Sequence, residues 1–163
     1  KSGNPDVKYF SGTARYSKKF NLPEGFLSDV VAFDLDLGKV RDIARVRLNG
    51  KDIGNLWYPP YSREVTEALK EGENILEVEV ANTWFNRLVG DETLPEDAEW
   101  KPRNSNGQLL KSFPDWYMKG EKSPSGRKAF TTFRNWRKDS PLIESGLIGP
   151  VILRPSKLSA LEL

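Results

Sequence analysis

The chain has 163 residues, with 25 Lys and Arg against 23 Asp and Glu, so its net charge is +2. It contains no cysteine and no histidine, which excludes disulfides, thiolate or histidine metal sites and a histidine general base. Basic residues are spread out and no apolar run approaches the roughly 20 residues that span a bilayer, so we expect neither a nucleic-acid nor a membrane partner.

Alternation of apolar and polar residues predicts the first half of the fold. Residues 1–12 form an entry segment whose aromatic pair, Tyr9 and Phe10, we expect to pack onto the fold. Alternation over 13–22, over 31–37 from Val31 onward, and over 44–48 indicates strands with one buried face.

A turn and two further strands follow. Asn49-Gly50 is the dipeptide that best tolerates positive φ in a tight hairpin. The return strand runs to Pro59-Pro60, where two backbone donors are missing. A short strand at 61–65 precedes a helical turn for which Thr66 is the expected N-cap. The strongest strand is 75–80.

Residues 92–128 have a different texture, with four prolines, three glycines and no sustained periodicity. Their aromatic residues argue against disorder, so we expect an ordered loop insertion. Strands at 129–133 and 151–153 are expected to close the fold. We therefore predict one antiparallel β-sandwich domain over 1–155, with 156–163 as an exit linker or tail.

Aromatic and polar residues just past strand ends are the candidate substrate-binding residues. Aromatic faces can stack on an apolar ligand surface, and polar side chains beside them can exchange hydrogen bonds with the same ligand. The alternative for each aromatic residue is packing, and for Arg87 with Asp91 it is an internal salt bridge. The candidates are Trp57, Tyr58, Tyr61, Trp84, Asn86, Arg87, Asp91 and Trp116.

Two neighbouring carboxylates can act as a catalytic acid and base, so the acidic residues of this chain are candidates for such a pair. The run from Asp91 to Glu99 fits a solvated acidic loop better, since a solvated acid keeps an ordinary pKa. We therefore expect no catalytic residue in this chain. Arg134 and Asp139 form a second candidate ion pair. No cofactor is expected; an oxygen-ligand Ca²⁺ site is conceivable, but no spacing places one.

A resemblance to a known family rests on the central stretch and on later motifs. The sequence resembles the galactose-binding-like jelly-roll domain of glycoside hydrolase family 2 and of family 106-type α-L-rhamnosidases. One departure is Asn135, where a histidine would be expected before Trp136. The residues that carry the resemblance include Asp36-Leu37-Gly38, Asn49-Gly50, Gly54, Trp57, Pro60, Gly72, Asn82, Trp84, 86–91, Ser145-Gly146-Leu147 and Gly149-Pro150-Val151.

The resemblance implies an all-β, antiparallel two-sheet jelly-roll sandwich, galactose-binding domain-like in fold. It implies a non-catalytic carbohydrate-binding or accessory domain of a larger glycoside hydrolase, with a carbohydrate and the parent's catalytic domain as partners. The alternative is a structural interdomain brace or protein-interaction module without sugar affinity. A secreted or periplasmic parent protein is also implied.

Overall fold

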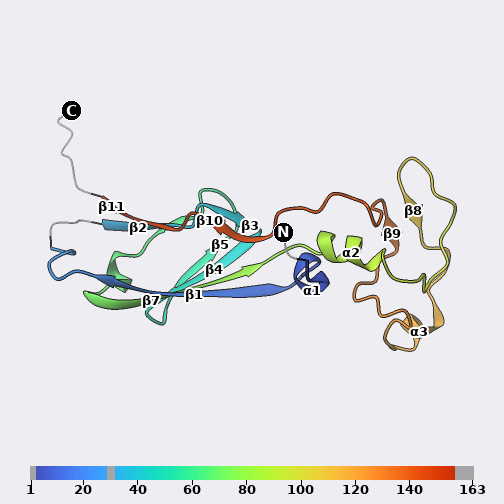
Figure 1. Cartoon of the computed structure of the whole chain (residues 1–163), viewed down its shortest axis with the longest axis horizontal. Helices are drawn as coiled ribbons and strands as arrows, with labels where there is room; N and C mark the ends of the chain where they lie inside the picture. The colour runs from blue at the N-terminus through green and yellow to red at the C-terminus, as the bar shows by residue number, and fades with distance from the viewer. Residues whose placement is uncertain (1–2, 29–31, 157–163) are drawn as a thin grey trace. The chain divides into compact units, whose positions relative to one another are not determined.

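The computed structural model describes residues 3–28 and 32–156, and the chain forms two compact units (Figure 1). The sandwich unit consists of Gly12–Asn82 and Glu144–Leu163. The excursion unit consists of Lys1–Ser11 and Thr83–Ile143. The predicted insertion, 92–128, lies wholly within the excursion unit. Val31 and residues 157–163 of the predicted tail lie outside the described residues.

The sandwich unit is built from antiparallel sheets. One sheet has the strand order β1-β7-β4-β5, a second has the order β11-β2-β6, and β10 pairs with β3. The strands are β1 (Thr13–Leu22), β2 (Ala32–Asp36), β3 (Lys39–Arg41), β4 (Ile43–Leu48), β5 (Lys51–Leu56), β6 (Ser62–Glu64), β7 (Gly72–Ala81), β10 (Gly146–Gly149) and β11 (Ile152–Ser156).

The core of this unit lies between its sheets. Leu76, Val78 and Val80 of β7 are buried, as their alternation with Glu77 and Glu79 predicts. They belong to one continuous cluster of fifteen buried apolar residues, every one of which lies in the sandwich unit. Burial of apolar surface at about 25 cal/mol per Å² is the main stabilising term for such a core. The all-β antiparallel sandwich is therefore confirmed.

The Asn49-Gly50 turn has the backbone that its sequence predicts, with φ of 55° and 81°. The Asn49 side chain also accepts a hydrogen bond from the Ile75 amide at 2.9 Å and donates to the Asn74 side chain at 2.8 Å. Asn74, fully buried, donates in turn to the Lys70 carbonyl at 2.7 Å. The turn is thus tied to the start of β7 by side chains as well as by strand pairing.

The predicted N-cap at Thr66 is wrong. Thr66 is the first residue of η1 (Thr66–Ala68), a single 3₁₀ turn, and its hydroxyl accepts a hydrogen bond from the Phe33 amide at 2.8 Å instead. The side chain links this turn to β2, which is a tertiary contact that local sequence does not reveal.

The excursion unit contains short elements separated by ordered loops. Its elements are α1 (Pro5–Lys8), α2 (Phe85–Asp91), β8 (Gln108–Leu109), α3 (Asp115–Met118) and β9 (Phe133–Arg134), with β8 paired to β9. Of the aromatic pair in the entry segment, Tyr9 packs as expected, whereas Phe10 is 40% exposed. The ring of Tyr9 lies over Gly90, so that a β-carbon there would come within 2.5 Å of Tyr9 Cγ.

The strand predicted over 129–133 is wrong, because only Phe133 and Arg134 pair with another strand. The backbone amides of Lys128 and Ala129 donate to a side chain, the Asp91 carboxylate, rather than to a neighbouring strand.

Candidate functional site

Buried ion pairs hold the excursion unit together. Arg134 Nη1 lies 3.1 Å from Glu92 Oε2 and 2.8 Å from Glu96 Oε1, and Arg127 Nη1 lies 3.1 Å from Glu92 Oε1. Arg127 also donates to the Pro95 carbonyl at 3.0 Å. Glu92, Arg127 and Arg134 are largely buried.

The expectation of a solvated acidic loop is therefore wrong for most of the run. The side chains of Asp91, Glu92 and Asp97 are 4%, 12% and 8% exposed, and arginines neutralise them. Arg134 pairs with this run rather than with Asp139, and its guanidinium stacks 4.2 Å from the centre of the Trp100 ring. These carboxylates support the cleft that is described below.

Asp91 at the end of α2 ties that helix to the segment around residue 128. Asp91 Oδ2 accepts hydrogen bonds from the amides of Lys128 at 3.0 Å and Ala129 at 2.8 Å. Asp91 Oδ1 lies 3.8 Å from Arg87 Nη1, one helical turn away. One buried carboxylate thereby positions two cationic residues, Arg87 and Lys128.

An aromatic cluster stands beside these residues. The rings of Tyr117 and Phe130 stack with centroids 4.0 Å apart, and Trp116 meets Phe130 edge to face at 5.6 Å. Trp116 Nε1 donates to the Asp97 carbonyl at 2.8 Å. The cluster is fixed on one side by this hydrogen bond, while Tyr117 remains 43% exposed.

The aromatic–cationic cleft is a hollow of about 700 Å³ within the excursion unit. Its aromatic walls can stack on a pyranose ring, and its cations can donate to hydroxyl or acidic oxygens. Asp6 is the one carboxylate among the residues that line it, whereas glycoside hydrolysis uses a pair. The lining residues are Asp6, Phe10, Ser11, Trp84, Arg87, Tyr117, Lys128, Ala129 and Phe130.

A second cavity of about 830 Å³ in the same unit shares part of this lining. Tyr117, Lys128, Ala129 and Phe130 line both, and Trp116 lines the second. The two hollows therefore offer adjoining places for a chain of linked sugar units.

The structure brings some of the predicted residues together here. Trp84 and Arg87 line the cleft, Trp116 lines the adjoining cavity, and Asp91 lies beneath as a support. Asn86 is buried and exchanges hydrogen bonds with the Ile143 backbone at 2.8 and 3.0 Å. The side-chain amide of Asn86 is therefore engaged in hydrogen bonds within the fold.

Trp57, Tyr58 and Tyr61 belong to the sandwich unit. Trp57 and Tyr58 are 67% and 60% exposed and pack edge to face. Tyr61 packs against the core, and its hydroxyl donates to the Asp42 carbonyl at 3.1 Å.

Sequence reasoning did not single out Asp6, Phe10, Lys128 or Phe130. Asp6 and Phe10 are far in sequence from the rest of the cleft, and only folding brings them near Lys128. Lys128 falls at the end of the predicted insertion 92–128 and Phe130 in the predicted strand 129–133, so no sequence pattern joins the two.

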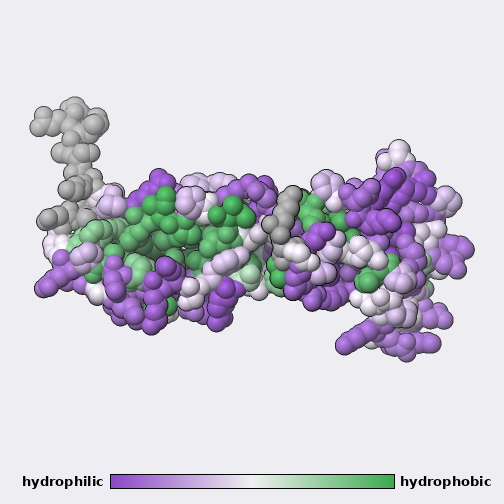
Figure 2. All heavy atoms as spheres, viewed as in Figure 1, coloured by the Kyte–Doolittle hydropathy of each residue, from purple (hydrophilic) through white to green (hydrophobic). Residues whose placement is uncertain are grey.

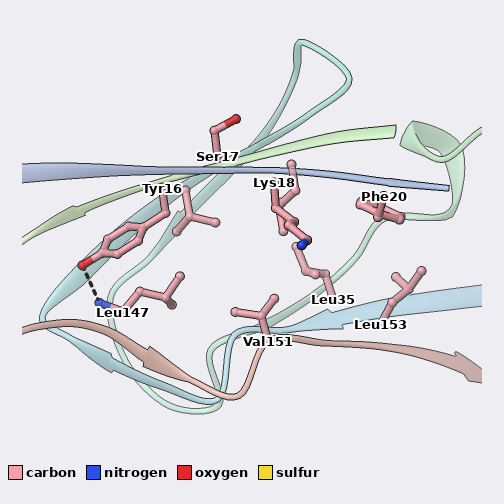
Figure 3. Close-up of a pocket in the computed structure, with 10 residues that line it drawn as sticks. Tyr16, Ser17, Lys18, Phe20, Leu35, Leu147, Val151 and Leu153 are labelled. Carbon is pink, nitrogen blue, oxygen red and sulfur yellow. Dashed lines mark hydrogen bonds between the residues drawn. The ribbon is translucent and has the colours of Figure 1, made fainter. Parts of the chain in front are cut away.

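The sandwich unit has an apolar groove of its own, of about 440 Å³. Figure 3 shows it between β1 above and β10 and β11 below, with Phe20, Leu35 and Leu153 pointing into it. At one end the Tyr16 hydroxyl accepts a hydrogen bond from the Leu147 amide at 3.2 Å (Figure 3). Apolar residues also show at the surface of this unit (Figure 2).

Two further features concern only residues 3–28 and 32–156. Among them no group of three or more acidic side chains is arranged to hold a metal ion, so the Ca²⁺ site stays a prediction. None of their helices is long and apolar enough to cross a membrane.

Comparison with known proteins gives matches over most of the chain. A protein of Formosa agariphila that is provisionally named a beta-glucuronidase is 48% identical over 148 residues, which are 91% of this chain and 12% of that protein. The solved rhamnosidase of Novosphingobium sp. PP1Y is 36% identical with a TM-score of 0.67, covering 94% of this chain and 12% of the rhamnosidase. The chain thus spans about an eighth of the length of these relatives.

The family model described as glycosyl hydrolase 2 galactose-binding domain-like matches residues 5–136. That range includes β1 to β7 of the sandwich and all the residues that line the cleft, and the match agrees with the resemblance of the sequence. The chain belongs to the glycosyl hydrolase 2 galactose-binding domain-like family.

Proposed function

We propose that this chain is a non-catalytic, saccharide-binding accessory domain of a larger glycoside hydrolase. The observation that carries the proposal is Trp84, which is 65% exposed and lines the cleft beside Arg87. An exposed indole next to a guanidinium offers a sugar both a stacking face and hydrogen-bond donors. The family and the eightfold greater length of the relatives support a catalytic domain elsewhere in the parent protein.

We propose rhamnosides and glucuronides as the glycosides to test first, because the two relatives are named as a rhamnosidase and a beta-glucuronidase. Following the same resemblance, we propose that the parent protein is secreted or periplasmic. The isolated domain should bind saccharides with millimolar affinity at best, about −4 kcal/mol, because the catalytic domain would supply the other wall.

The test is a titration of the 163-residue chain with oligosaccharides that contain rhamnose or glucuronic acid, followed by NMR. The side-chain Nε1–H of Trp84 and amides near Arg87 should shift, and Trp84→Ala should abolish the shifts. Trp57→Ala is the matched control, because Trp57 is equally exposed, at 67%, but lies in the sandwich unit. If nothing moves at tens of millimolar sugar, the saccharide-binding proposal is wrong.

A structural brace is the second candidate function, and the apolar groove of the sandwich unit favours it. The groove is lined by Tyr16, Phe20, Leu35, Leu147 and Leu153 among others, and such a surface suits contact with another part of the parent protein. If the groove is a contact, backbone amides around Leu147 should gain hydrogen-exchange protection in the full-length parent relative to this chain. Equal hydrogen-exchange protection in the parent protein and in this chain would show that the brace hypothesis is wrong.

A further inference from the structure

We propose that the aromatic–cationic cleft selects acidic saccharides, with Arg87 and Lys128 binding a carboxylate or sulfate group on the sugar. This inference rests on the proposed function and names the class of saccharide. Uronic acids and sulfated sugars share the required chemistry, namely a planar or tetrahedral group of negatively charged oxygens on a pyranose ring.

Arg87 is the first reason. Its side chain is only 15% exposed, and the interaction that the described residues offer it is Asp91 Oδ1, at 3.8 Å from Nη1. That distance exceeds a hydrogen bond. A guanidinium has five N–H donors in a fixed fork, so Arg87 reaches the cleft with donors available for two oxygens of one acidic group.

Asp91 explains why the guanidinium of Arg87 is held at the cleft with its donors unengaged. Asp91 Oδ2 is fixed by the amides of Lys128 and Ala129. Asp91 Oδ1 is buried without a hydrogen-bond partner among the described residues. The carboxylate therefore attracts Arg87 without engaging its donors, which makes Asp91 a positioning residue for the guanidinium.

Lys128 is the second cation. Its Nζ lies 3.4 Å from Asp6 Oδ1, and the two side chains are 61% and 81% exposed. Such an exposed pair is weak, so an acidic ligand can replace Asp6 as the partner of Lys128. Asp91 balances the charge of Arg87, so the preference for an acidic ligand over a neutral sugar comes from the unengaged donors of Arg87 and from the weakly paired Lys128.

The aromatic walls distinguish a sugar from a simple anion. Trp84 is 65% exposed and Tyr117 is 43% exposed, and both line the same cleft as the two cations. Aromatic faces bind the C–H face of a pyranose, whereas acetate or inorganic sulfate has no such face. The cleft thus combines a ring-stacking surface with a binding place for acidic oxygens.

The test is an NMR titration of the full 163-residue chain with four probes at equal ionic strength. The probes are methyl β-D-glucuronide, methyl β-D-glucoside 6-sulfate, neutral methyl β-D-glucoside and sodium acetate. We expect both acidic sugars to bind at least about tenfold more tightly than the neutral one, because a charge-assisted bidentate contact is lost in the latter. Acetate should leave the Trp84 indole unshifted.

Two variants examine the cations separately. Arg87→Lys keeps the charge but loses the fork, so it should reduce binding of the glucuronide by a larger factor than binding of the neutral glucoside. Lys128→Gln should weaken both acidic sugars. Lys111→Gln is the control, because Lys111 is an equally exposed lysine of the same unit, paired with Glu99, and does not line the cleft. Since Lys128 is exposed, its variant stays informative even if Arg87→Lys unfolds.

The outcomes separate this inference from the proposed function. If neutral and acidic sugars shift the same residues with equal affinity, the acidic preference is wrong and the saccharide-binding function stands. If no sugar shifts Trp84, both are wrong. If acetate produces the same shifts as the glucuronide, the cleft binds an anion alone and the inference is overturned. If glucuronide binds more tightly than the sulfate ester, or the reverse, the acidic group is identified.

Discussion

The two units of this chain are held together by different interactions. In the sandwich unit fifteen apolar side chains form one buried cluster. In the excursion unit the buried residues other than glycine, among those that the structure describes, are Val89, Asn86, Asp91 and Arg134, and three of these four are polar or charged. Apolar contacts have no preferred direction, whereas each hydrogen bond or ion pair fixes the position of two groups.

This difference suits a division of work between the units. An apolar core tolerates changes of shape among similar side chains, which is appropriate for a scaffold. A cleft must hold each wall in place, and in the excursion unit the walls are held by Asp91, Arg127 and Arg134 through directional contacts. A buried polar network that is satisfied rigidifies its surroundings, but it is costly to break.

The units can be followed separately in solution. Four of the five tryptophans, Trp84, Trp100, Trp116 and Trp136, lie in the excursion unit, and Trp57 lies in the sandwich unit. Tryptophan fluorescence of a Trp57→Phe background therefore reports the excursion unit, and far-ultraviolet circular dichroism reports mainly the sandwich strands.

The largest effect is expected from Arg134→Met. The change removes the cation that Glu92 and Glu96 share, leaving Glu92 buried with Arg127 alone. Breaking a buried pair in this way costs about 3–5 kcal/mol. Urea denaturation followed by fluorescence should show the loss, while the circular dichroism transition stays in place.

Lys111→Met is the control for that variant, because its pair with Glu99 is exposed. It should leave the circular dichroism transition unchanged and lower the fluorescence transition only slightly, because an exposed pair is weak. If Arg134→Met lowers both transitions together, the two units unfold as one cooperative body and the comparison fails.

An intermediate effect is expected from Val78→Ala, which truncates a side chain that is 1% exposed in the sandwich core. The lost burial and the cavity should cost about 1–3 kcal/mol, seen by circular dichroism. Ile75→Ala on the same strand is the matched control, since Ile75 is 37% exposed and should lose less. A midpoint unchanged by Val78→Ala would show that this face of β7 does not support the core.

The smallest effect is expected from the outer face of the sandwich sheet. A hydrogen bond from Arg15, with its charge, holds the pKa of Glu79 below its ordinary value of 4.5. Because the folded pKa is the lower one, the pair contributes stability above about pH 4.5 and loses it as the pH falls through the folded pKa. Glu79→Gln should therefore lower the circular dichroism midpoint slightly at pH 7, and the difference should diminish as the pH falls below 4.5.

Glu99 in the excursion unit gives the corresponding measurement there. Its pKa is lowered by the hydrogen bond and charge of Lys111. Glu99→Gln should therefore lower the fluorescence midpoint at pH 7, and this difference should diminish as the pH falls below 4.5.

The outcome that would contradict the prediction for Glu79 is a Glu79→Gln difference that persists unchanged at pH 3. It would show that the substitution removes packing and not charge.

The sandwich could be predicted because its strands leave a local signature. In a strand with one buried face, apolar and polar side chains alternate along the chain. In β7 this alternation predicts both the strand and its buried face, with Leu76, Val78 and Val80 inside and Glu77 and Glu79 outside. Asn49-Gly50 likewise carries its own backbone preference. Only elements defined by a distant partner were missed there, such as β3 and the contact of Thr66 with Phe33.

The site was predicted less completely because its contacts join residues far apart in sequence. Asp91 binds the amides of residues 128 and 129, and Glu92 binds Arg134, over separations of about forty positions. No local period marks such partners, so the acidic run was interpreted as solvated. Trp84 and Arg87 were found because they follow directly after β7, where a rigid frame presents loop residues.

Side-chain hydrogen bonds join the two ends of the segment that the chain inserts between β7 and β10. Asn82 exchanges hydrogen bonds with the Gly12 backbone and donates to the Ser145 hydroxyl, and four residues later Asn86 clamps Ile143. These side-chain hydrogen bonds therefore hold the two ends of the segment 83–143 together. Doubling the length of a closed loop costs only about 0.6 kcal/mol. A segment of another length can therefore replace residues 83–143 at a small cost in chain entropy, while the sandwich unit keeps its own strands and core.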